Sequence, residues 1–252
     1  KVHVPCTRSY ERYYFTPGPE FVVADTRYGK VGLAICYDRR YPETCRELMK
    51  KGARAEDILV TGIPVRQQFL DADYRQKRER NRTRRVLIMG GGLGLMPDLK
   101  ELLEKLHSMQ GVESVVITGK NHKMYEEWVN RYEDVEVLGY TENISRYMRG
   151  ADLVITKAGG ITLFEILHSQ VPLFVIHPFL EQEMNNARYA AEKGFAKVIW
   201  GRREDYIQEL EKLLSDEKMM EEMTGNVRRA CKEMIEVSLD EAVGIMEERM
   251  TA

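Results

Sequence analysis

The sequence predicts an α/β protein whose larger part is a Rossmann-like parallel sheet domain. From Arg85 to the C-terminus, short apolar runs of the length of buried strands alternate with segments long enough for helices. The expected strands are residues 86–89, 115–118, 135–138, 151–155, 173–176 and 196–199. The first 52 residues show another pattern, two short β-like runs followed by one helix. We therefore expect a doubly wound sheet preceded by a small, separate fragment.

The composition is that of an ordinary soluble globular protein. Of the 252 residues, 43% are hydrophobic and 31% are charged, which supplies enough apolar material for a sizeable core. A formal net charge of −2 favours neither nucleic acid nor a uniformly anionic partner. The four cysteines (Cys6, Cys36, Cys45 and Cys231) show neither the density of a secreted disulfide scaffold nor the CxxC spacing of a metal site. With no apolar run of membrane-spanning length and no signal peptide, a cytoplasmic protein is predicted.

The N-terminal fragment is expected to contain a hairpin and a helix. Residues 21–24 and 30–35 are β-like runs on either side of 25–29, which has the composition of a turn. Pro42 is placed to open a helix that continues to Lys51.

A basic segment precedes the predicted sheet. Residues 74–85 contain seven lysines or arginines. Such a run is attracted to anionic lipid headgroups or RNA, but a solvated interdomain linker is the more common explanation. No aromatic residue follows Tyr74 in the run, so we expect no nucleic-acid partner. Contact of residues 75–85 with an anionic membrane surface stays open.

Two glycine-rich turns follow predicted strands. Gly91 and Gly92 lie in a loop after strand 86–89 that does not have the G-x-G-x-x-G spacing of a dinucleotide fingerprint. Gly159 and Gly160 lie between strand 151–156 and a helix over 161–167, whose apolar face is marked by Ile161, Phe164 and Leu167. Free N–H groups at the start of that helix suit a phosphate, and the glycines permit close approach.

A carboxylate is placed to extend this anion site. Glu165 lies in the first turns of the helix after Gly160, where its two oxygens could accept hydrogen bonds from a ribose diol. The spacing therefore outlines a site for a nucleoside diphosphate. On spacing alone, an ordinary βαβ unit with a Gly-Gly turn explains the segment equally well.

A family resemblance favours the nucleotide site. The segment 157–165, Pro178 and the segment 181–187 resemble the donor-site signature of monogalactosyldiacylglycerol synthases and processive diacylglycerol glucosyltransferases. The resemblance extends from about residue 51 to the C-terminus. It implies the C-terminal half of a glycosyltransferase B fold, in an inverting enzyme that transfers a hexose from a UDP-sugar to a lipid without a metal. The donor-binding residues that it implies are Gly91, Gly92, Gly139, Tyr140, Gly159, Gly160, Ile161, Thr162, Glu165, Gln182, Glu183 and Asn186.

The N-terminal fragment resembles a second family. The segments 1–5, 14–18 and 29–43 are similar to the middle of nitrilase-superfamily carbon–nitrogen hydrolases, nearest to N-carbamoyl amidases. The resemblance implies that Cys36 is a nucleophile and Lys1 the lysine of a Glu-Lys-Cys triad, with the glutamate upstream of Lys1. From the residues alone, Cys36 is more simply a small buried hydrophobe. Since the chain begins with lysine, we expect a processed, trimmed or fragmentary product.

Together these patterns predict a chimera. The expected parts are a nitrilase-like fragment (1–52), the last strand of an acceptor domain with a basic linker (53–84), and a UDP-sugar-binding domain (85–252). The expected function is donor binding for a glycolipid-forming glycosyltransferase, with a lipid such as diacylglycerol as acceptor and incomplete catalysis by this chain alone. The alternatives are an amidohydrolase, also incomplete, and a non-functional fusion. The expected location is the cytoplasm, with peripheral membrane attachment as an option.

Overall fold

The computed structural model describes residues 23–26, 29–32, 42–52, 65–70, 83–90, 98–201 and 205–233, together with Gly244 and Glu248. The chain divides into two compact units. One consists of Lys1–Gly62 and Val237–Ala252, and the other is Ile63–Glu236.

The first unit contains the predicted hairpin and helix. Strands β1 (Val23–Thr26) and β2 (Gly29–Gly32) pair antiparallel, with Thr26 opposite Gly29. Helix α2 spans Pro42–Lys50 and begins at the predicted proline. The predicted catalytic residues of this fragment, Cys36 and Lys1, lie outside the described residues.

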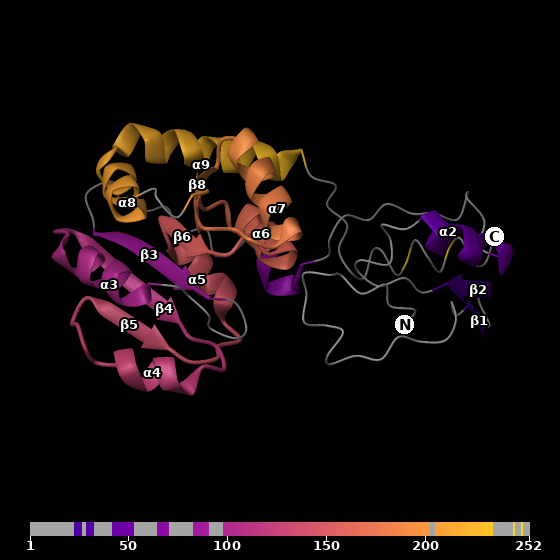
Figure 1. The fold of residues 1–252 in the computed structure, drawn as a ribbon, viewed down its shortest axis with the longest axis horizontal. Coiled ribbons are helices and arrows are strands. Elements are labelled where there is room, and N and C mark those ends of the chain that lie inside the picture. Colours follow the sequence, from indigo (N-terminus) through magenta and orange to yellow (C-terminus); the bar gives the residue numbers. More distant parts are fainter. Residues whose placement is uncertain are drawn as a thin grey trace. The chain divides into compact units, whose positions relative to one another are not determined.

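The second unit is built on the predicted parallel sheet (Figure 1). Its strands are β3 (Arg84–Met89), β4 (Val112–Ile117), β5 (Val135–Leu138), β6 (Leu153–Thr156), β7 (Leu173–Ile176) and β8 (Ala196–Ile199). They lie in the order β5-β4-β3-β6-β7-β8, and every neighbouring pair is parallel. β4 begins three residues before the predicted run, because the polar Glu113 and Ser114 also pair with β3.

Helices cover both faces of this sheet, as buried parallel strands require (Figure 1). They are α3 (Leu99–Ser108), α4 (His122–Trp128), α5 (Ile144–Gly150), α6 (Gly160–Ser169), α7 (Glu181–Glu192), α8 (Tyr206–Ser215) and α9 (Glu217–Lys232), with the 3-10 turn η3 (Gln67–Phe69). Leu87 and Met89 point into the cluster with α5, α6 and α7, whereas Val86 and Ile88 point into the cluster with α3, α4 and α8. The alternation along β3 therefore separates two cores.

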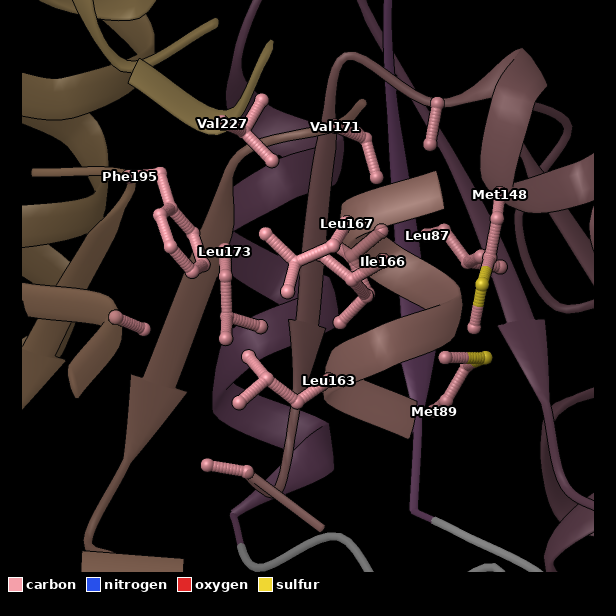
Figure 2. Close-up of a cluster of buried hydrophobic side chains, with 14 of the residues drawn as sticks. Leu87, Met89, Met148, Leu163, Ile166, Leu167, Val171, Leu173, Phe195 and Val227 are labelled. Carbon is pink, nitrogen blue, oxygen red and sulfur yellow. The ribbon is translucent and has the colours of Figure 1, made fainter. Parts of the chain in front are cut away.

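Helix α6 is fixed to the sheet through one face (Figure 2). Leu163, Ile166 and Leu167 are each at most 2% exposed and pack with Leu173 and Phe195. The predicted apolar face was wrong in part, because Ile161 is 63% exposed and lies in the first turn of the helix. Spacings of three and four residues select 163, 166 and 167 as the buried stripe.

Candidate functional site

The topology indicates where a ligand would bind. β3 and β6 are neighbours at the centre of the sheet, and the chain leaves them toward opposite edges, to β4 and β7. In open α/β sheets such a switch point creates a crevice outside the carboxyl ends of the two strands. The loop after β6, which leads through Gly159 into α6 at Gly160, lies at this position.

The start of α6 offers free backbone donors at this edge. Gly159 is the N-cap residue in an extended conformation, and no side chain caps the helix. The first helical hydrogen bond runs from the Leu163 amide to the Gly159 carbonyl at 2.9 Å, so the amides of 160–162 have no acceptor within the helix. Donors at the positive end of a helix dipole suit a phosphate group.

Gly159 is not required by the conformation or packing of the chain. Its φ of −67° is one that any residue adopts, and a Cβ there would have its nearest neighbour, Thr162 Oγ1, at 3.9 Å. Within the described residues neither observation calls for a glycine, and a glycine at this position would permit close approach of a ligand.

We therefore expect Gly159→Ala to fold normally but to bind UDP roughly tenfold more weakly. Stability should change by less than about 1 kcal/mol, because the backbone fits alanine. Gly225→Ala in α9, where a Cβ would meet nothing within 4 Å, is the matched control and should leave UDP affinity unchanged. Equal UDP affinities for both variants would show that no ligand approaches Gly159.

Glu165 is buried behind these donors in the second turn of α6. Its side chain is 6% exposed, and its Oε1 accepts a hydrogen bond from Nε of Arg66 at 2.9 Å and forms an ion pair with Nη2, also at 2.9 Å. Burial raises the pKa of the Glu165 carboxyl, and the Arg66 guanidinium opposes this effect by lowering the pKa. No hydrogen bond within the described residues engages Oε2, so this oxygen remains able to accept one.

The residues that precede and open α7 support the loop after β6. Glu183 Oε2 accepts hydrogen bonds from the amides of Phe179 and Leu180, at 3.4 Å each, and so caps the helix. Asn186 Nδ2 donates to the Ala158 carbonyl at 2.8 Å and ties α7 to the loop. In this structure these two predicted donor-binding residues have partners within the chain, whereas Gln182 is exposed.

Two further residues at this edge were not among the predicted site residues. The Lys157 ammonium lies 5.6 Å from the centre of the Phe179 ring, directly before the glycine loop. His177 follows β7 with a φ of +48°, and among the described residues its buried Nδ1 has no hydrogen-bond partner. Lys157 adds a positive charge to the segment that leads into α6, and a positive charge favours an anionic ligand.

The other predicted donor-binding residues lie farther away or are not described. Gly139 and the 68% exposed Tyr140 follow β5, the edge strand, with β4 and β3 between it and β6. Among the described residues, a Cβ on Gly139 would meet the Gly119 carbonyl at 3.9 Å. Gly91 and Gly92 lie outside the described residues.

A cavity of about 320 Å³ lies at the opposite, amino-terminal edge of the sheet. Its lining includes Glu113, Glu133, Asp134 and Glu136, with Arg85 as the one basic residue. Carboxylates in this number repel a phosphate group, so we place no nucleotide there. The described residues contain neither a helix able to cross a membrane nor a group of three potential metal ligands.

Comparison with known proteins identifies the family of the second unit. Residues 85–239 match the glycosyltransferase family 28 C-terminal domain. The chain belongs to this family. Residues 1–73 match the carbon–nitrogen hydrolase family, so one chain carries parts of two families, as predicted. The second match extends past residue 52, and the boundaries of the expected parts stay predictions.

Relatives named for their activity support the resemblance to diacylglycerol glucosyltransferases. A processive diacylglycerol beta-glucosyltransferase from Bacillus licheniformis is 35% identical over 195 residues, which are 72% of this chain and 50% of that protein. The enzyme of the same name from Bacillus pumilus is 34% identical over 220 residues, 82% of this chain and 57% of the relative. The chain thus spans about half the length of these relatives.

Solved structures share the fold. The glycotransferase of kitacinnamycin is 21% identical with a TM-score of 0.55, and the match covers 75% of this chain and 48% of that one. The spinosyn rhamnosyltransferase SpnG complexed with thymidine diphosphate is 18% identical with a TM-score of 0.52, covering 67% and 46%. At these identities the likeness concerns the fold, a Rossmann-like half of a two-domain glycosyltransferase.

Proposed function

We propose that the carboxyl edge of the sheet binds the nucleoside diphosphate of a UDP-sugar. The free amides at the start of α6 and the Lys157 ammonium meet the diphosphate, and Glu165 accepts hydrogen bonds from the ribose hydroxyls. The observation that carries the proposal is a buried carboxylate one turn behind an uncapped helix start in a family 28 domain. No metal is needed in this arrangement, since fixed donors and a lysine meet the negative charge.

A thermal-shift measurement tests the proposal. A ligand that binds only the folded state stabilises it by about 2.7 kcal/mol at a concentration one hundred times its Kd. UDP should therefore raise the melting temperature of the chain, whereas uridine, which lacks the diphosphate, should raise it much less. Equal shifts with UDP and uridine would remove the α6 amides and Lys157 from the site.

We further propose that the bound sugar is a hexose destined for a lipid acceptor such as diacylglycerol, by an inverting reaction. The names of the Bacillus relatives support this class of product. Because this chain spans about half of those proteins, we propose that the acceptor pocket and catalytic base belong to the other half. The proposed parts of this chain remain 1–52, 53–84 and 85–252.

Residues 1–252 alone should then bind a UDP-sugar without transferring the sugar. General-base catalysis contributes about 10²–10⁴-fold in rate, and the acceptor must also be positioned. The measurement is the formation of glycolipid from radiolabelled UDP-glucose and diacylglycerol vesicles by the purified chain. Glycolipid at a rate that Glu165→Ala abolishes would show that no second half is needed.

Contact of residues 75–85 with an anionic membrane surface remains a proposal. Most of this run lies outside the described residues. At its end, Arg84 pairs with Glu217 at 3.8 Å and Arg85 with Glu113 at 3.3 Å. These two arginines therefore have carboxylate partners within the chain, and any attraction to anionic lipids would come from the residues before them. Peripheral attachment at the cytoplasmic face fits a lipid acceptor.

The match of residues 1–73 to carbon–nitrogen hydrolases supports a second candidate function, amide or carbamoyl hydrolysis. By resemblance Cys36 would be its nucleophile and Lys1 would steady the intermediate. Activity would require a base for the thiol proton. Turnover of an N-carbamoyl amino acid by the chain, lost in Cys36→Ala, is the observation that would establish this function.

A further inference from the structure

The pair of Arg66 and Glu165 joins residues that are 99 positions apart in the sequence. Nε and Nη2 of Arg66 both lie 2.9 Å from Oε1 of Glu165. Hydrogen bonds between charged partners are stronger and shorter than neutral ones. The carboxylate is nearly enclosed, with 6% of its side chain exposed, whereas the Arg66 side chain is 49% exposed.

Arg66 is held by a segment that is itself anchored. Val65 and Phe69, on either side of Gln67 and Gln68, are 8% and 2% exposed and belong to the core around α6. Arg149 Nη2 donates to the Phe69 carbonyl at 2.7 Å, and Ser145 donates to Gln68 at 3.1 Å. The guanidinium also lies 5.3 Å from the centre of the Phe69 ring. Arg66 thus reaches Glu165 from a fixed backbone.

Arg66 engages only one of the two carboxylate oxygens of Glu165. Oε1 makes both contacts with Arg66, and no hydrogen bond in the described part of the chain reaches Oε2. Because Arg66 holds one oxygen, rotation of the carboxylate is restricted. Its other oxygen can accept a hydrogen bond from a ligand hydroxyl. Such a bond is strong only while the group is ionised, and burial opposes ionisation.

We propose that Arg66 is a positioning residue for the nucleotide, which keeps Glu165 charged and oriented so that its free oxygen accepts a ribose hydroxyl of a UDP-sugar. This inference rests on the proposed function, because it assigns Arg66 a role at the same site. Arg66 acts through Glu165 and is assigned no contact with the ligand.

Charged groups nearest to this pair on the elements packed against α6 include several that bind residues other than Glu165. Arg149 of α5 donates a hydrogen bond to the Phe69 carbonyl in η3. On α7, Glu183 is bound to the amides before the helix. At the end of α9, Arg229 is bound to Asn226, and Glu233 to Lys193. Arg66 is the charged residue that opposes the effect of burial on the Glu165 pKa.

The sign of the expected pH effect follows from these contacts. Burial raises the pKa of Glu165 and Arg66 lowers it, so removing Arg66 should raise the pKa further. The variant should therefore protonate Glu165, and lose the strong ribose bond, at a higher pH than the wild type. A residue that only anchors the segment would change affinity equally at every pH.

The test is calorimetric titration of UDP-glucose into Arg66→Met at a series of pH values between about 8 and 5, because a raised carboxyl pKa brings protonation closer to neutral pH. UDP-glucose is used because both phosphates are esterified, whereas the terminal phosphate of UDP has a second pKa of about 6. We expect Arg66→Met to lose roughly tenfold in affinity from the highest to the lowest pH, and the wild type clearly less.

Three controls isolate the effect. Arg149→Met removes another arginine that anchors the same segment and should keep the wild-type pH profile. Arg66→Lys retains a positive charge and should restore much of that profile. In the background Glu165→Gln, which cannot ionise, Arg66→Met should no longer alter the pH dependence.

The outcomes separate this inference from the proposed function. A pH profile for Arg66→Met parallel to that of the wild type, or a shift that persists with Glu165→Gln, would overturn the role of Arg66 while leaving nucleotide binding intact. Absence of UDP-glucose binding by the folded wild-type chain at every pH would instead overturn the proposed function.

Discussion

Replacing Glu165 with alanine is expected to weaken UDP binding by roughly 10- to 150-fold, because hydrogen bonds to a charged group contribute about 1.5–3 kcal/mol. Glu165 is 4% exposed. Arg66 engages one of its carboxylate oxygens, and the other oxygen can accept a hydrogen bond from a ligand. Calorimetric titration of UDP into the folded variant measures the effect. Thr162→Ala, which removes one hydroxyl near the start of α6, should cost less affinity.

The alternative role for Glu165 is a charge that stabilises the start of α6. Under that alternative, Glu165→Ala would lose thermal stability but keep its UDP affinity. The geometry disfavours it, because α6 begins at Gly160 and the dipole effect fades beyond the first turn. Glu165→Gln is the matched control, since it keeps the shape of the side chain without its charge, and its affinity should fall between those of wild type and Glu165→Ala. Unchanged affinity in both variants would remove Glu165 from the site.

Replacing Ile166 with alanine should destabilise the second unit by about 2–5 kcal/mol, because it leaves a cavity in a closely packed core. Ile166 is 0% exposed, and its side chain belongs to the core cluster between its own helix, α6, and the sheet (Figure 2). The measurement is urea unfolding followed by tryptophan fluorescence. Both tryptophans, Trp128 and Trp200, lie within Ile63–Glu236, so the signal reports on this unit.

Ile161→Ala provides the matched control on the same helix. Its side chain is 63% exposed, so its loss should change stability by about 0.5 kcal/mol or less. Similar losses for the two variants would mean that α6 does not pack on the sheet through its 163, 166 and 167 face. The difference matters for the site, because this packing fixes the position of the glycine loop.

The sheet could be predicted from the sequence because buried parallel strands are short, apolar and separated by helices. The runs at 135–138, 173–176 and 196–199 coincide with β5, β7 and β8. The apolar face of α6 was harder to predict, because residues 161, 163, 164, 166 and 167 are all large and apolar. A helix of this kind has no clear polar face, and only the packing shows which side chains are buried.

The local backbone of the candidate site could be predicted where neighbouring residues define it. The Gly159–Gly160 turn and the start of α6 follow from neighbouring residues in the chain. The partner of Glu165 was not predictable in this way, because Arg66 is brought to it by the packing of Val65 and Phe69 in the core. For the same reason the sequence could not show that Glu183 and Asn186 bind backbone groups of the chain itself.

The most direct test of nucleotide-sugar binding is calorimetric titration of the purified 252-residue chain with UDP, UDP-glucose and UDP-galactose. The structure and the membership of family 28 lead us to expect saturable binding of UDP at one site per chain, weakened in Glu165→Ala. Preference between the two sugars would then identify the hexose. If the folded chain bound none of the three ligands, the proposed site at the carboxyl ends of β3 and β6 would be wrong.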